Sequence, residues 1–103
     1  MLLPERDDEG HCWHIFTPLL PLERVMLRRS DFLRGMHERG IGIGVHYPAI
    51  HELELYQKLG FAQRAFPNAE RIGRETVTLP LHVDMDSGDV ERVCQVVAEI
   101  LGS

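Results

Sequence analysis

Four side chains with hydrogen-bonding rings are the strongest candidates for chemistry in this sequence: His14, His46, Tyr47 and His51. Tyr47 stands directly before Pro48, and proline forces the residue before it into an extended conformation. The turn around Pro48 should therefore present its side chains outward. Imidazole and phenol groups there can hydrogen-bond a substrate carboxylate or a sugar hydroxyl, so we take these four residues as candidate substrate-binding residues.

Each of these residues also has a purely structural interpretation. A histidine that ends a strand, as His46 does here, can simply satisfy a backbone group, and a lone tyrosine such as Tyr47 is commonly a half-buried packing residue. Trp13 and His14 alternate along a predicted strand, so only one of them faces the core, and Trp13 is the expected core residue. The residue types alone leave both interpretations open.

Other polar clusters lack the pattern that a catalytic or metal site requires. Gly42 and Gly44 alternate within a predicted strand, and no Gly-Lys-Ser/Thr sequence follows them as in a phosphate loop. Asp84, Asp86 and Asp89 precede a predicted helix, where capping and the helix dipole explain them, and their spacing is not that of an EF-hand. We assign no catalytic residue from these clusters.

The two cysteines, Cys12 and Cys94, are far apart in the sequence. Cys12 stands between His11 and His14, but these residues do not match a zinc spacing and no second pair of ligands follows. We therefore predict two buried free thiols and no metal site.

Length and composition bound the class of protein. The chain has 103 residues, 44% of them hydrophobic, which predicts one compact domain with a modest core. Its net charge of -5 argues against a nucleic-acid partner, and no apolar run is long enough to span a membrane. No signal peptide is evident, so the cytoplasm is the expected compartment.

The elements that position these residues are predicted from hydrophobic periodicity and capping signals. Residues 1–10 are polar and acidic and predict a linker or loop, so we expect the chain to begin within a longer protein. Three short strands are predicted, at residues 12–20 (confined by its prolines to an edge or strand end), 41–45 and 76–81. Helices are predicted at residues 30–40, 51–59 and 67–75 and after Asp86. Ser30 is the expected N-cap of the first, and Ala69, Ile72 and Gly73 of the third are expected to face the core.

Residues 22–29 fit either a strand or a helix, and residues 61–66 are predicted to form a loop. The glycine-lined face of the 41–45 strand leaves room for something large to approach. Together these elements predict an α/β (α+β) fold: a small two-layer sandwich of an about three-stranded sheet with helices on one face.

Four linked segments resemble one protein family. Residues 40–51 (GIGIGVHYPAIH), 66–71 (FPNAER) and 78–81 (TLPL), followed by the Asp86 helix, resemble the C-terminal region of DegT/DnrJ/StrS-type sugar aminotransferases. Residues 13–16 (WHIF) resemble the strand that opens the same domain. The resemblance covers nearly all of residues 11–103, and it implies the small C-terminal domain of an aminotransferase of the aspartate aminotransferase fold.

The resemblance implies an enzyme that uses pyridoxal phosphate (PLP) to move an amino group from glutamate to a nucleotide-linked keto-sugar. It also implies a homodimeric parent whose large upstream domain holds PLP and its lysine. The single lysine here, Lys58, matches no family motif and is interpreted as a surface residue, so we expect no bound PLP and no turnover by this chain alone. A stand-alone ligand-binding or regulatory module is the alternative.

Overall fold

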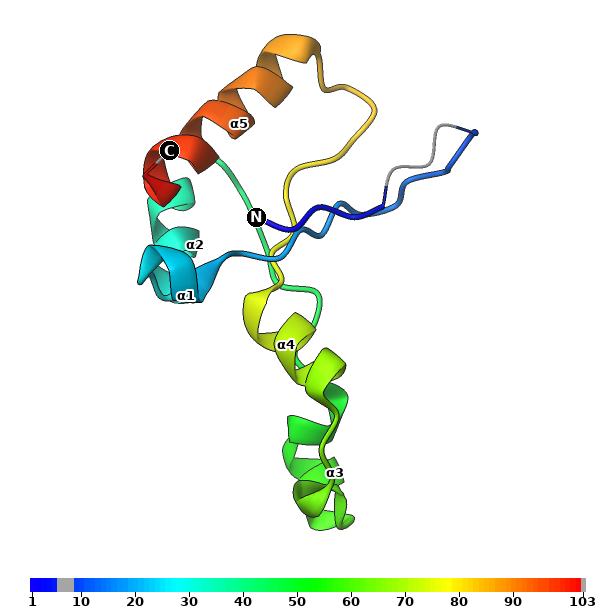
Figure 1. Cartoon of the computed structure of the whole chain (residues 1–103). Helices are drawn as coiled ribbons and strands as arrows, with labels where there is room; N and C mark the ends of the chain where they lie inside the picture. Colours follow the sequence, from blue (N-terminus) through cyan, green and yellow to red (C-terminus); the bar gives the residue numbers. More distant parts are fainter. Residues whose placement is uncertain (6–8, 103) are drawn as a thin grey trace.

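A computed structural model of the chain describes residues 1–5 and 9–102. The predicted 1–10 linker therefore lies partly outside the described residues. The helices are α1 (Leu22–Val25), α2 (Arg29–Glu38), η1 (Ile50–Glu52), α3 (Glu54–Lys58), η2 (Phe61–Gln63), α4 (Pro67–Glu75) and α5 (Ser87–Leu101). Figure 1 shows α1, α2 and α5 gathered around crossing extended segments, while α4 and α3 run away from them as an arm. The molecule is correspondingly elongated, with extents of 48 × 34 × 21 Å.

Extended segments cross the centre of the molecule and pair through isolated antiparallel bridges. Leu19 pairs on both sides, with Leu2 and with Thr76, and Thr78 pairs with Gly44. The spatial order is therefore the N-terminal segment, residues 16–19, residues 76–79 and the segment around Gly44. The three predicted strands do lie beside one another, but within the described residues no continuous strand forms.

Prolines explain why the predicted sheet is reduced to bridges. Pro18, Pro21 and Pro80 carry no N–H group, so each removes a donor from the ladder. The carbonyl of Pro18 still accepts a hydrogen bond from the Val77 N–H at 3.1 Å. The first segment was predicted to be an edge or a strand end, and at Leu19 it is not an edge, because Leu19 has a partner on each side.

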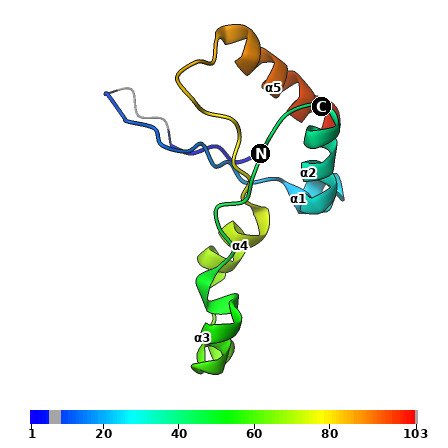
Figure 2. The same cartoon turned by 180° about the vertical axis from the view of Figure 1, so that it is seen from behind.

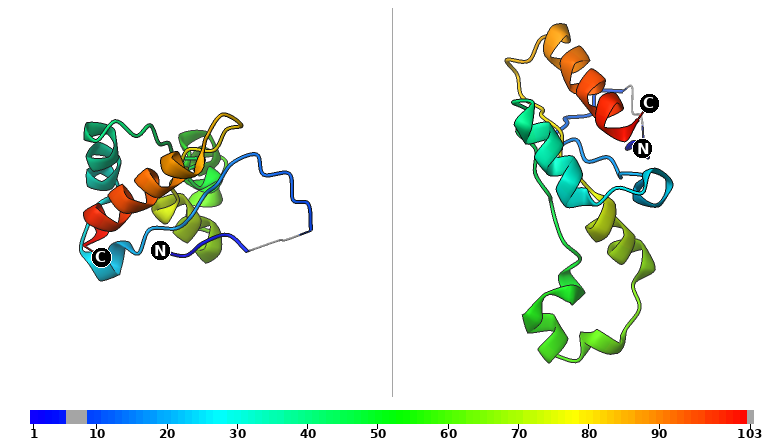
Figure 3. Two further views of the ribbon diagram at one scale, coloured as in Figure 1. Left: turned by 90° about the horizontal axis from the view of Figure 1, so that it is seen from above. Right: turned by 90° about the vertical axis from the view of Figure 1, so that its left-hand side faces the viewer.

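The core lies between α2, α5 and the crossing segments. Figure 3 shows α2 and α5 side by side. The buried cluster consists of Leu20, Phe32, Met36, Ile41, Val77 and Val96. Phe32 and Met36 are one helical turn apart, on the face of α2 that packs on the core. The amphipathic C-terminal helix and its Asp86 cap are confirmed, because Asp86 and Asp89 form a reciprocal capping box.

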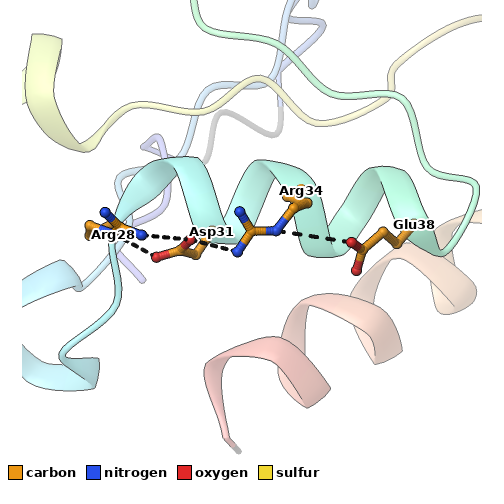
Figure 4. Close-up of polar contacts among 4 residues, drawn as sticks. All are labelled: Arg28, Asp31, Arg34 and Glu38. Carbon is orange, nitrogen blue, oxygen red and sulfur yellow. Dashed lines mark hydrogen bonds and ion pairs between the residues drawn. The ribbon is translucent and has the colours of Figure 1, made fainter.

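Helix α2 begins differently from the prediction. Arg28, and not Ser30, occupies the N-cap position, and it makes no side-chain cap. Instead Arg28 and Arg34 both bind the Asp31 carboxylate, at 2.9 and 2.7 Å (Figure 4). The Arg28 hydrogen bond holds the pKa of Asp31 below its ordinary value. A carboxylate in the first turn also complements the helix dipole, which makes a neutral cap dispensable.

Several residues predicted to be buried are exposed. Trp13 is 38% exposed, and its ring packs against the rings of His11 and Phe16, which are not part of the buried core. Cys12 and Cys94 are both exposed free thiols, which corrects the prediction of buried ones. Cys94 lies beside the α5 stripe that packs on the core, and the residues that pack there are Val93, Val96, Val97, Ile100 and Leu101.

The arm contains the remaining differences. The helix predicted at 51–59 is interrupted because Leu53 is extended, so η1 and α3 are separate. Helix α4 is confirmed with its N-terminal Pro67, and Gly73 is buried as predicted against Ala49. Ala69 and Ile72 are exposed, which corrects the prediction that they face the core. The view from behind shows α4 and α3 in line, away from the core helices (Figure 2). None of the helices described is long and apolar enough to cross a membrane.

Candidate functional site

The crossing segments form an open hollow of about 370 Å³ that brings two of the four candidate residues together. His14 comes from the first segment, and His46 follows the glycine-rich segment. Its walls also include Gly42, Gly44 and Thr78. The bare face predicted from the alternating glycines is therefore part of a real concavity, and two exposed imidazoles line it.

His46 is fixed by its neighbours. Its Nδ1 lies 2.7 Å from the Thr78 hydroxyl oxygen, which belongs to the adjacent segment. Its ring lies over Gly44, since a Cβ at position 44 would be 3.0 Å from the His46 Cε1 atom. The second ring nitrogen, Nε2, is not used by Thr78. His46 thus satisfies a side chain of the next segment and still lines the hollow.

Tyr47 lies beside His46 but does not line the hollow. Its side chain is 70% exposed, and its ring meets the His46 ring edge-on with centroids 4.9 Å apart. The alternative of a half-buried packing tyrosine is therefore wrong. The phenol is free to contact a ligand or another surface next to the hollow.

His51 has a different environment from the other candidates. Its Nε2 lies 3.1 Å from a Glu70 carboxylate oxygen, and its ring packs against Phe66 with centroids 4.8 Å apart. The same Glu70 oxygen accepts the Phe66 N–H, and this hydrogen bond, followed by the one from His51, lowers the pKa of Glu70. Gln57 donates to the His51 carbonyl. His51 of η1 is therefore bound to Glu70 of α4, and the structure does not place it with His14 and His46.

The turn after Tyr47 is packed tightly on α4. Ala49 is buried, and a Cβ at Gly73 would lie only 2.5 Å from the Ala49 backbone nitrogen. Arg29 of α2 donates to the carbonyls of Gly73 and Thr76 at 2.5 and 3.3 Å, which caps the end of α4 with a cation. These contacts fix the position of the turn that follows His46 and Tyr47.

Lys58, the single lysine of the chain, is not placed to hold PLP. Lys58 lies on the exposed surface of α3, where its Nζ pairs with Glu54 at 2.5 Å. Nothing there desolvates the amine, so it is not suited to form a Schiff base. Among residues 1–5 and 9–102, no group of three or more His, Cys, Asp or Glu side chains is placed to hold a metal ion.

Thr78 is the residue that the sequence analysis missed. It falls within the predicted 76–81 strand, where it alternates with Val77 and Leu79. Its alternation did place its side chain opposite those two, but nothing in the sequence indicated that Gly44 would pair with it and bring His46 within reach.

Comparison with solved structures defines the class of protein. The chain is similar to the aminotransferase PseC of Helicobacter pylori, described as involved in pseudoaminic acid biosynthesis, with TM-score 0.75 and 26% identity over 86% of this chain and 24% of that one. It is similar to the aminotransferase TlmJ of Streptoalloteichus hindustanus, with TM-score 0.75 and 25% identity over 97% and 26% of the two chains. The fold is that of a part of an aminotransferase.

The sequence places the chain more narrowly. The model of the DegT/DnrJ/EryC1/StrS aminotransferase family matches residues 1–98, and the chain belongs to this family. An uncharacterized protein of Methanocaldococcus jannaschii is 30% identical over 92 residues, which are 88% of this chain and 24% of that protein. The chain thus spans about a quarter of the length of the relatives it matches.

Proposed function

We propose that this chain is the C-terminal domain of a PLP-dependent enzyme that transfers an amino group from glutamate to a nucleotide-linked keto-sugar. Membership of an aminotransferase family supports the reaction, and the family is PLP-dependent. The described involvement of the Helicobacter pylori relative in pseudoaminic acid biosynthesis supports a sugar substrate. The enzyme would act in the cytoplasm, in polysaccharide or antibiotic sugar biosynthesis.

In this proposal the rest of the polypeptide holds PLP, and this chain alone is inactive. PLP supplies the electron sink for amino transfer, but it needs a lysine in a suitable pocket. Lys58 has 72% of its side chain exposed and is paired with Glu54, so it does not fit that role. The exposed apolar side chains of the arm, Leu53, Leu55 and Leu59, support docking to the large domain or to the second subunit of a homodimer.

The hollow is the proposed contribution of this domain to substrate binding. The observation that carries this role is that His14 and His46, 32 residues apart in the sequence, line one concavity with Thr78. Imidazole nitrogens there can hydrogen-bond hydroxyl or phosphate oxygens of the substrate. Tyr47 stands next to His46 and can extend the same surface.

The test is kinetic and uses the longer enzyme. His46→Ala and His14→Ala should raise KM for the nucleotide keto-sugar about fivefold each, as expected for a lost hydrogen bond, and leave KM for glutamate unchanged. His37→Ala is the matched control, because His37 is exposed on α2 and does not line the hollow. Equal sugar KM values in all three variants would remove the hollow from substrate binding.

A further inference from the structure

Two backbone hydrogen bonds with Gly44 fix the position of Thr78, independently of its side chain. Its N–H donates to the Gly44 carbonyl at 2.8 Å, and its carbonyl accepts the Gly44 N–H at 3.2 Å. This two-way pairing fixes the distance between the two segments. The Thr78 hydroxyl then lies 2.7 Å from His46 Nδ1, two residues beyond Gly44.

The imidazole of His46 is confined from a second direction by Gly44. A Cβ on Gly44 would be 3.0 Å from Cε1, 3.6 Å from Nδ1 and 3.8 Å from Nε2 of the ring. The ring therefore covers the place that a side chain at position 44 would occupy. Contact with Gly44 below and the hydrogen bond to Thr78 together leave the ring little freedom to rotate.

The hydrogen bond also has a consequence for the proton on the ring. A neutral imidazole has one N–H and one bare nitrogen, and a threonine hydroxyl has one proton to give. Within the described residues the Thr78 hydroxyl has no second hydrogen-bond partner. If it donates to Nδ1, both groups are satisfied, and the ring proton is left on Nε2.

We propose that Thr78 is a positioning residue that donates its hydroxyl proton to His46 Nδ1 and thereby keeps His46 in the Nε2–H tautomer. His46 then presents a fixed hydrogen-bond donor to the hollow. A neutral donor of this kind selects oxygen acceptors, such as the keto, hydroxyl or phosphate oxygens of a nucleotide sugar. That choice of ligand rests on the proposed function, whereas the tautomer does not.

The tautomer can be measured directly by ¹⁵N NMR of the histidine rings in the 103-residue chain, at about pH 8.5, where imidazole is neutral. The wild-type chain should show the His46 proton on Nε2. Thr78→Val keeps the shape of the side chain but removes the hydroxyl, and it should lower the ratio of Nε2–H to Nδ1–H about fivefold. Thr78→Ser should restore the ratio, and the tautomer of His14 should not change in either variant.

Two results would overturn the inference: a wild-type His46 that carries its proton on Nδ1, or a tautomer ratio that Thr78→Val leaves unchanged. Gly44→Ala provides a second test that keeps Thr78 intact. Its Cβ should displace the ring and lower the same ratio, and an unchanged His46 spectrum would also contradict the proposal.

The inference and the proposed function can fail separately. If the NMR result holds and Thr78→Val in the longer enzyme leaves KM for the keto-sugar unchanged, then Thr78 positions His46 but the hollow does not bind that substrate. If the NMR result fails, the positioning role is lost whatever the kinetics show.

Discussion

A glycine-to-alanine pair tests whether the turn behind His46 depends on close packing against α4. Gly73 of α4 and Gly35 of α2 are both glycines inside helices. Alanine at either position should gain helix propensity of up to about 1 kcal/mol. The two positions differ in what the new Cβ would meet.

At position 73 the Cβ would lie 2.5 Å from the Ala49 backbone nitrogen, and backbone atoms cannot rotate away. At position 35 it would lie 3.0 Å from Cδ1 of Ile100, the end of a flexible side chain. Overpacking typically costs about 1–3 kcal/mol, and a backbone clash belongs in the upper half of that range. Gly73→Ala should therefore lower the free energy of unfolding by about 1–2 kcal/mol, whereas Gly35→Ala should range from neutral to about 1 kcal/mol stabilising.

Urea unfolding followed by far-ultraviolet circular dichroism measures both variants against the wild type. An m-value equal to that of the wild type shows that the change lies in stability. Because the turn leads from Tyr47 to the arm, we also expect Gly73→Ala to shift the His46 ring signals, and Gly35→Ala to leave them unchanged. If Gly73→Ala is as stable as Gly35→Ala, Ala49 does not pack on α4 as described.

Two further predictions concern stability. Asp86→Ala removes half of the α5 capping box and should lower the free energy of unfolding by about 1 kcal/mol. The control variant Asp84→Ala should leave the urea midpoint unchanged. If Asp86→Ala and Asp84→Ala have equal urea midpoints, the capping box does not stabilise α5. The pKa of Glu70 is held below its ordinary value of 4.5, first by the Phe66 N–H and then by His51. The unfolded chain therefore takes up the Glu70 proton at a higher pH than the folded chain does. The contribution of ionised Glu70 to the free energy of unfolding is therefore complete above a pH of about 4.5 and is lost as the pH falls through the lowered pKa. Between about pH 6 and pH 3, Glu70→Gln should consequently lose less stability than the wild type. If the free energy of unfolding falls equally with pH in the wild type and in Glu70→Gln, this reasoning is contradicted.

The sequence located most of the elements because local signals decide them. Asp86 and Asp89, spaced as a capping box, fixed the start of the last helix, and Pro67 fixed the start of α4. Phe32, Leu33 and Met36 recur at helical spacing in the sequence, and the structure buries Phe32 and Met36 and packs the partly buried Leu33 against the core. Burial was harder to predict for residues such as Trp13 and Cys94, since hydrophobic character does not say which side of an element finds a partner.

The candidate site, like the fold, could be predicted only in part. Residue types and the Pro48 turn were enough to select His14, His46, Tyr47 and His51, and the four linked motifs were enough to indicate the aminotransferase family. Which of these side chains meet was not contained in any local signal.

Only the tertiary structure decided that His46 joins His14 in one hollow, that Thr78 holds its ring, and that His51 instead binds Glu70 at the base of the arm. The physical reason is that these partners are far apart in the sequence: His51 and Glu70 are separated by 19 residues, and His46 and Thr78 by 32. Capping and periodicity act within one helix or one strand. The register between segments is instead set by the pairing of Gly44 with Thr78 and the packing of Ala49 on Gly73, which form only when the whole chain is folded.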